Sequence, residues 1–105
     1  MVIDTSDLKI SHEADGLHVY LEGRFTASVA NRLLYFMRAY FRKTPHIHIH
    51  TDGVTSFETL GLGMFQQGLG PMKNDCSRFL FTGFNASRLA DVWPESKRFA
   101  FPNSE

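Results

Sequence analysis

Histidines at alternate positions are the side chains of this sequence best suited to metal chemistry. The segment HIHIHTD (residues 46–52) alternates histidine with isoleucine, which predicts a strand with His46, His48 and His50 on one face. Alternate residues of a strand leave the same face about 6.5–7 Å apart, so a His-x-His pair can bind one zinc ion. His18, in a second alternating segment, is a candidate additional ligand.

The same alternation has a second explanation, because polar histidines can cover the solvent face of a sheet that is packed on one side only. No carboxylate is clearly placed in the sequence to orient a metal-ligating histidine, and no general base or nucleophile accompanies the group. We therefore expect no metal site, no cofactor and no enzymatic activity. We also expect the isolated chain to bind zinc no more tightly than a surface histidine pair does.

Cys76 is the single cysteine of the chain and lies next to Asp75 and near Arg78. A neighbouring arginine can favour the reactive thiolate, but no histidine is close in sequence, so we do not predict a nucleophile here. One cysteine excludes an internal disulfide and a multi-cysteine zinc site, and it is typical of a reducing compartment.

Glycines interrupt an otherwise helical run in the stretch SFETLGLGMF, which begins at Ser56. Glycine inside a helix costs roughly 1 kcal/mol relative to alanine, so a local requirement must offset it. Two phosphate-binding patterns do not supply that requirement. The third glycine of a dinucleotide fingerprint would fall at Gln66, and a P-loop that starts at Gly63 would have Leu69 in place of its lysine.

The composition indicates one domain, residues 1–105, without a strong electrostatic preference. A chain of 105 residues with 43% hydrophobic content suits one compact core. Eleven basic and eleven acidic residues cancel, which argues against nucleic acid as a partner and favours a protein or a small molecule. No apolar run approaches the ~20 residues that span a bilayer, and the N-terminus has acidic residues where a secretory signal has basic ones. We expect a cytoplasmic protein that is not an integral membrane protein.

The elements that must position these residues follow from periodicity and turn signals. Alternating segments and an Asp-Gly hairpin signal predict strands over residues 8–12, 16–22, 46–52, 77–83 and 97–101. Helical spacing predicts helices over residues 27–43, from the stretch at Ser56 to about Gly68, and from Asn85 or Ser87 onward. Thr26 or Ser28 is expected to cap the first helix. The order predicts a two-layer α/β fold, with a mixed β-sheet, parallel pairings from its β-α-β units and helices packed on one face.

The segment ETLGLG (residues 58–63) resembles the Asp-Ser-x-Gly-Leu-Gly signature of STAS domains, the family that contains the anti-sigma factor antagonists of bacteria. The segment GRFT (residues 23–26) occupies the place of the family's turn into the first helix, and a strand and a short helix follow the signature as they do in the family. The resemblance covers residues 8–101. Glu58 stands where the family usually has aspartate, and Thr26 stands where many antagonists have aspartate.

The resemblance implies that Thr59 is phosphorylated by a partner kinase at the start of the second helix, with Ser56 as the second choice. It also implies that the glycines let this helix end approach the neighbouring backbone and a partner. A different explanation needs no phosphate, because Thr55-x-x-Glu58 matches a capping box and the hydroxyl groups would then only cap the helix.

The function implied by the resemblance is a non-enzymatic, phosphorylation-controlled protein–protein interaction switch in bacterial transcription regulation. The implied partners are an anti-sigma factor or a serine/threonine protein kinase of the histidine-kinase-like fold, and a phosphatase. An alternative within the family is a cytoplasmic STAS subunit of a lipid-transport ATP-binding cassette complex. The residues expected to bind the partner are Gly23, Arg24, Phe25, Thr26, Ser56, Glu58, Thr59, Leu60 and Gly61.

Overall fold

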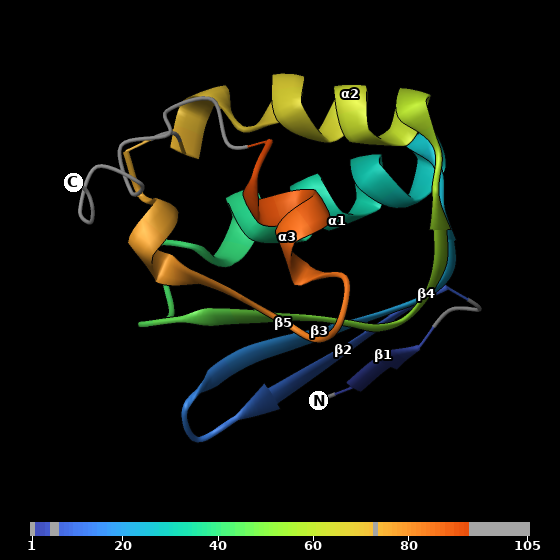
Figure 1. Cartoon of the computed structure of the whole chain (residues 1–105). Helices are drawn as coiled ribbons and strands as arrows, with labels where there is room; N and C mark the ends of the chain where they lie inside the picture. Colours follow the sequence, from blue (N-terminus) through green and yellow to red (C-terminus); the bar gives the residue numbers. More distant parts are fainter. Residues whose placement is uncertain (1, 5–6, 73, 93–105) are drawn as a thin grey trace, which may run out of the picture.

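Three strands precede alternating helices and strands in the computed structural model, which describes residues 2–4, 7–72 and 74–92 (Figure 1). The elements are, in order, β1 (Val2–Asp4), β2 (Leu8–Glu13), β3 (Gly16–Phe25), α1 (Ala27–Tyr40), β4 (Ile47–Phe57), α2 (Thr59–Gly68), the 3-10 turns η1 (Gly70–Met72) and η2 (Cys76–Arg78), β5 (Phe79–Thr82) and α3 (Ala86–Ala90). No helix among the described residues is long and apolar enough to cross a membrane.

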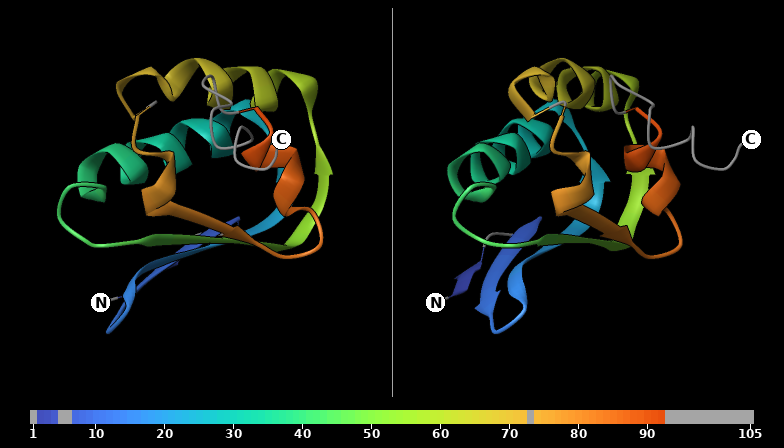
Figure 2. Two further views of the ribbon diagram at one scale, coloured as in Figure 1. Left: turned by 60° about the vertical axis from the view of Figure 1, so that its left-hand side comes forward. Right: turned by 90° about the vertical axis from the view of Figure 1, so that its left-hand side faces the viewer.

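The strands form one mixed sheet in the order β1-β2-β3-β4-β5. The hairpin partners β1, β2 and β3 pair antiparallel, whereas β3 with β4 and β4 with β5 pair parallel. The parallel pairs arise because α1 and α2 return the chain to the same end of the sheet before the next strand. The three α-helices all lie on one side of the sheet (Figure 2), which confirms the predicted two-layer α/β arrangement.

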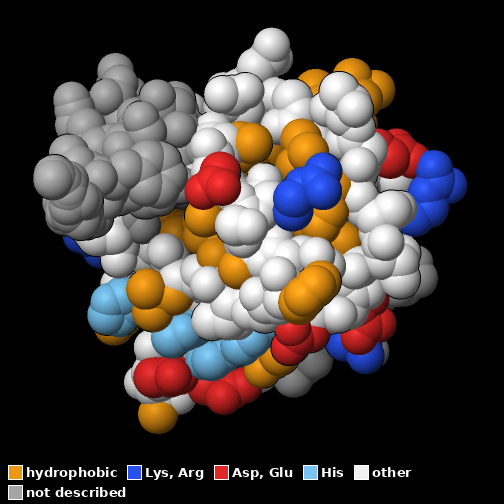
Figure 3. Space-filling model, viewed as in Figure 1, with side chains coloured by type: hydrophobic (Ala, Val, Ile, Leu, Met, Phe, Trp, Pro, Cys, Tyr) orange, Lys and Arg blue, Asp and Glu red, His pale blue; other side chains and the backbone are white. Residues whose placement is uncertain are grey.

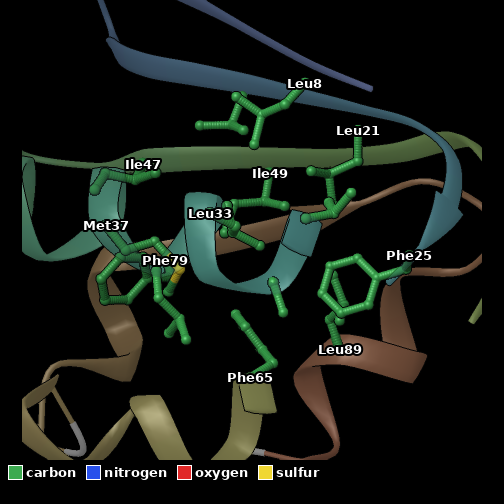
Figure 4. Close-up of a cluster of buried hydrophobic side chains, with 14 of the residues drawn as sticks. Leu8, Leu21, Phe25, Leu33, Met37, Ile47, Ile49, Phe65, Phe79 and Leu89 are labelled. Atoms are coloured by element: carbon green, nitrogen blue, oxygen red, sulfur yellow. The ribbon is translucent and has the colours of Figure 1, made fainter. Parts of the chain in front are cut away.

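The core lies between the sheet and the helices (Figure 4). Alternate residues of β2, β3 and β4 face the helices and are at most 1% exposed; they are Leu8, Ile10, Leu17, Val19, Leu21, Ile47 and Ile49. Leu33 and Met37 of α1 and Phe65 of α2 pack against them. Each buried side chain of this size contributes about 1.5–3 kcal/mol. A shift of register by one residue would expose the whole apolar set, so the core also fixes which residues face away from the helices.

Helix α1 begins at the position that its capping residue specifies. Thr26 has extended backbone angles, and its Oγ1 accepts a hydrogen bond of 3.3 Å from the N–H of Val29. Thr26 is therefore the cap, and Ser28 lies inside the helix. The helix ends at Tyr40, before the predicted residue 43, because the N–H groups of Lys43 and Thr44 both bond the Tyr40 carbonyl in a turn.

Strand β4 is longer than the histidine segment and reaches Phe57. Its pairing with β3 shifts register twice, between Tyr20 and Glu22 and between Gly23 and Arg24 of the partner strand, and β4 holds the extra residue each time. Such bulges bend a strand, and β4 curves toward the start of α2 in Figure 1. The prediction that Ser56 and its neighbours belong to the second helix is therefore wrong, because hydrogen bonds to β3 hold them in the sheet.

The capping-box explanation is also wrong, because Thr55 lies within β4. The residue that precedes α2 is Glu58, whose side chain makes no capping hydrogen bond.

Beyond α2, β5 confirms the central part of the strand predicted over residues 77–83. Asn85 rather than Ser87 precedes α3. Strand β1 was not predicted. The strand predicted over residues 97–101 lies outside the described residues.

Candidate functional site

The start of α2 lies against the segment that joins β3 to α1. Arg24 pairs with Ser56 and Phe25 with Phe57 in the parallel register of β3 and β4. The pairing continues one residue further, where the Glu58 N–H donates a hydrogen bond of 3.0 Å to the Phe25 carbonyl. Residues 23–26, Ser56 and residues 58–61, which the sequence assigned to one partner surface, are therefore neighbours in the fold. Phe25 is 1% exposed and Gly61 is buried, so the prediction that these two residues contact a partner is wrong.

Gly61 is the residue at which the backbones come closest. A Cβ atom at this position would lie 2.6 Å from the Phe25 carbonyl oxygen and 2.9 Å from the Thr26 carbonyl carbon. Any side chain would push α2 away from the turn, so the approach requires glycine. Gly63 differs, because a Cβ atom there would meet no heavy atom within 4 Å.

Charged and apolar side chains surround this junction. Arg24 forms an ion pair with Glu58 across the two segments, and the two side chains are 68% and 34% exposed. Solvent screens such a pair, so we assign it at most about 1 kcal/mol. Leu60, the second residue of α2, is 67% exposed. The surface therefore combines an exposed apolar side chain with an exposed arginine that is paired with a carboxylate.

Thr59 is the first residue of α2 and is exposed. The first N–H groups of a helix have no acceptor within the helix, and the Glu58 side chain does not cap these. Ser56 is also exposed, at the end of β4. The two hydroxyl groups that the sequence singled out are both accessible, but only Thr59 opens the helix.

Histidines form a second group on the sheet face that points away from the helices. His18 of β3 is in register with His48 of β4, and Tyr20 is in register with His50. The His18 and His48 rings stack with centroids 4.2 Å apart, and the Tyr20 and His50 rings stack at 4.4 Å. Figure 3 shows histidine side chains, in pale blue, gathered along the lower side of the molecule next to acidic side chains. The predicted placement of the histidines on the uncovered face is confirmed.

A chain of hydrogen bonds links this group to a carboxylate that the sequence did not identify. His18 Nε2 lies 2.8 Å from Asp15 Oδ1, and His18 Nδ1 lies 2.8 Å from His50 Nε2. His50 Nδ1 lies 3.0 Å from Thr82 Oγ1 on β5. The expectation that no carboxylate orients these histidines is wrong, because the β2–β3 turn places Asp15 over the start of β3.

The cluster changes the acid–base properties of its members. The hydrogen bond from His18 holds the pKa of the Asp15 carboxyl below its usual value, with a smaller contribution of the same sign from the His18 charge. Burial lowers the pKa of His50 below 6.5, and the charges of His18 and His48 lower it further. The outer histidine, His46, is exposed, with its ring 6.2 Å from that of His48.

Comparison with known proteins identifies the fold only. No family model matches the chain, and no curated protein matches it. Two solved structures, described as crystal structure analyses of Mglu and of Mglu in its native form, are similar in structure. They give TM-scores of 0.56 and 0.53 at 15% and 13% sequence identity, over 69% and 71% of this chain. The match spans only 18% and 23% of the Mglu chains.

Proposed function

We propose that this protein is a non-enzymatic protein–protein interaction switch whose affinity for its partner is controlled by phosphorylation of Thr59. One observation carries the proposal: an exposed hydroxyl residue opens α2 at the junction where α2 contacts the β3–α1 segment. Residues from both segments form one surface there. A single modification at Thr59 therefore changes the charge of a surface built from two parts of the chain.

The start of α2 tolerates a phosphate without unfolding. Phosphate adds about −1.5 to −2 charges and three acceptor oxygens, and the first N–H groups and the positive dipole end of a helix stabilise it. Arg24 is the arginine that forms an ion pair with Glu58, the residue before Thr59. A phosphate on Thr59 competes with the Glu58 carboxylate for this guanidinium, because charge-assisted bonds to a doubly charged group are stronger. Phosphorylation of Thr59 would therefore change the ion pairing of Arg24 as well as the net charge of the surface.

The unphosphorylated surface suits a protein partner. Leu60 is the largest exposed apolar side chain at this junction, and the neighbouring Gly63 leaves open space beside the helix. An apolar contact at Leu60 and the Arg24–Glu58 pair at its rim match the usual division of an interface into an apolar centre and a polar edge. The partner class that fits this proposal is an anti-sigma factor or a serine/threonine kinase of the histidine-kinase-like fold, with a phosphatase to reverse the modification.

The test begins with the identity of the partner. The wild-type chain, used as bait in an extract of cells that encode it, should retain an ATP-binding kinase of the histidine-kinase-like fold. Recovery of a membrane transport ATPase instead would favour the alternative, a cytoplasmic subunit of a lipid transporter. Leu60→Ser should weaken retention, whereas Leu80→Ser, a matched change of an exposed leucine on β5, should leave it unchanged.

The modification is then measured by intact mass. With the retained kinase and ATP, wild type and Ser56→Ala should each gain one phosphate, and Thr59→Ala should gain none. Thr59→Ala is expected to fold, because the Thr59 side chain is exposed and α2 begins without it as a cap. Phosphate on Thr59→Ala would place the site elsewhere and contradict the proposal.

A further inference from the structure

A set of metal-ligand atoms converges at the β2–β3 turn, away from the start of α2. Asp15 in the turn, His18 on β3 and His48 on β4 each place one ligand atom within 4.8 Å of the other two. Asp15 Oδ1 is 2.8 Å from His18 Nε2, and Asp15 Oδ2 is 3.7 Å from His48 Nε2. A tetrahedral zinc ion with ligand distances of ~2.0–2.1 Å separates its ligand atoms by roughly 3.3 Å. The two Asp15–histidine separations, one to each carboxylate oxygen, lie on either side of that value.

The donor types select a particular class of ion. Two imidazole nitrogens and one carboxylate oxygen are ordinary ligands of zinc and of similar first-row metals, and they do not suit magnesium or calcium, which prefer oxygen alone. Glu13 is a further carboxylate at the edge of the cluster, with Oε1 4.0 Å from His18 Nε2. A fourth coordination position is thus available to this carboxylate or to water.

The hydrogen-bond chain behind His18 suits both a metal-free and a metal-bound cluster. In the metal-free form, an ionised Asp15 can only accept, so His18 Nε2 donates to it; with neutral imidazoles, His50 Nε2 then donates to His18 Nδ1 and the Thr82 hydroxyl donates to His50 Nδ1. When an ion takes the place of the proton between His18 and Asp15, the chain reverses. His18 Nδ1 then donates to His50 Nε2, and His50 Nδ1 donates to Thr82. Both arrangements hold the same number of protons and satisfy every nitrogen of the chain.

Hydrogen bonds hold His18 more firmly than His48, whose Nε2 has only a 3.4 Å contact with the Asp15 carbonyl oxygen. The His18 side chain is 11% exposed and held through both ring nitrogens, which resembles a metal-ligating histidine oriented by an outer hydrogen bond. The His48 ring lies nearly parallel to that of His18, at an interplanar angle of 8°. A ligand nitrogen must point at the ion in the plane of its ring, so His48 turns about its Cβ–Cγ bond when the ion binds.

We propose that Asp15, His18 and His48 form a binding site for one zinc-class divalent cation, with His50 as the positioning residue behind His18. This site is not the His-x-His pair that the sequence suggests, because its two histidines come from neighbouring strands and its carboxylate comes from the turn. The cation links the turn to both strands. It lies near the beginning of β4, whereas Thr59 follows the end of β4.

Zinc titration by calorimetry, in a buffer that does not bind metal, tests the site on the whole chain. Wild type should bind one zinc per chain and should not bind magnesium. Asp15→Asn and His48→Ala should each weaken zinc binding by at least ~10-fold, because even the loss of a residue that only supports a ligand costs that much. Two variants serve as controls. His46→Ala removes the histidine that forms a His-x-His pair with His48 in the sequence, and His12→Ala removes a histidine whose ring contacts Tyr40. Both variants should bind zinc with an affinity within about twofold of wild type.

Two results would overturn the site. One is a wild type that binds no stoichiometric zinc. The other is a His46→Ala variant that loses as much zinc affinity as Asp15→Asn, since the ion would then be bound by the His46–His48 pair of the sequence pattern. Histidine ring signals of the wild type, followed by NMR during the titration, give a readout that does not depend on how the variants fold. The signals of His18 and His48 should shift with the first equivalent of zinc, and that of His12 should not.

Discussion

The substitutions Gly61→Ala and Gly63→Ala form a matched pair within α2 and test why glycine occupies the start of this helix. A Cβ atom at Gly61 would lie 2.6 Å from the Phe25 carbonyl oxygen, whereas one at Gly63 would meet nothing within 4 Å. Neither glycine has a positive φ, so backbone strain does not distinguish them. The main difference between the two sites is therefore the approach of α2 to the β3–α1 segment at Gly61.

The expected magnitudes follow from these distances. Both variants gain about 1 kcal/mol, because alanine favours the helix over glycine. Gly61→Ala also requires the Phe25 carbonyl to move by about 0.8 Å to reach 3.4 Å, where ordinary contact begins, and displacements of this kind cost typically ~1–3 kcal/mol. Gly63→Ala should raise the free energy of unfolding by about 0.5–1 kcal/mol, and Gly61→Ala should lower it by about 0–2 kcal/mol.

Urea unfolding measures both variants, with the slope m as a check that the transition is unchanged. The difference between the two variants isolates the contact, since the gain in helix propensity is common to both. Equal stabilisation by Gly61→Ala and Gly63→Ala would refute the close approach. The proximity of Thr59 to residues 23–26 would then depend only on the pairing of β3 with β4 and on the Glu58–Phe25 hydrogen bond.

Two further predictions concern the cap of α1 and the histidine cluster. Thr26→Ala should lower the free energy of unfolding by about 1 kcal/mol, because it removes the side chain that caps α1 at Val29. Ser28→Ala, inside the first turn of α1, should lower it by no more than a few tenths of that amount. Equal losses for the two variants in urea would contradict the identification of Thr26 as the cap. The lowered pKa of His50 means that the unfolded chain binds more protons below pH 6.5. Stability should therefore fall as the pH decreases from 6.5 through this lowered pKa. His50→Gln should flatten that part of the urea-midpoint profile, and an unchanged slope would show that another group is responsible.

Much of the fold could be predicted from alternation and turn signals. The apolar residues at alternate positions of β2, β3 and β4 specify a one-sided sheet, and the Asp-Gly turn specifies the hairpin that joins β2 to β3. Helix α1 could be predicted from its apolar spacing and from Thr26. These signals are local, and each depends on only a few neighbouring residues.

The parts that could not be predicted depend on contacts between distant segments. The bulges of β4 interrupt the alternation of buried and exposed residues after His50. The sequence pattern around Ser56 therefore predicts a helix, although pairing with β3 holds this segment in the sheet. Asp15 is exposed in a turn, and nothing in its neighbourhood shows that it reaches His18 and His48. Gly61 illustrates the same limit, because its requirement for glycine comes from the backbone of Phe25 and Thr26.

The most direct measurement of the central claim compares the affinity of the partner kinase or anti-sigma factor for the unmodified chain and for the chain phosphorylated at Thr59. We expect the phosphorylated chain to bind at least ~10-fold more weakly, since the partner would have to desolvate a group of about −2 charge on a surface that it contacts in the unmodified form, and this costs more than the ~1.4 kcal/mol that the factor represents. Thr59→Ala should bind as the unmodified chain does, and Thr59→Glu should bind more weakly. Equal affinity of the modified and unmodified chains would contradict the switch.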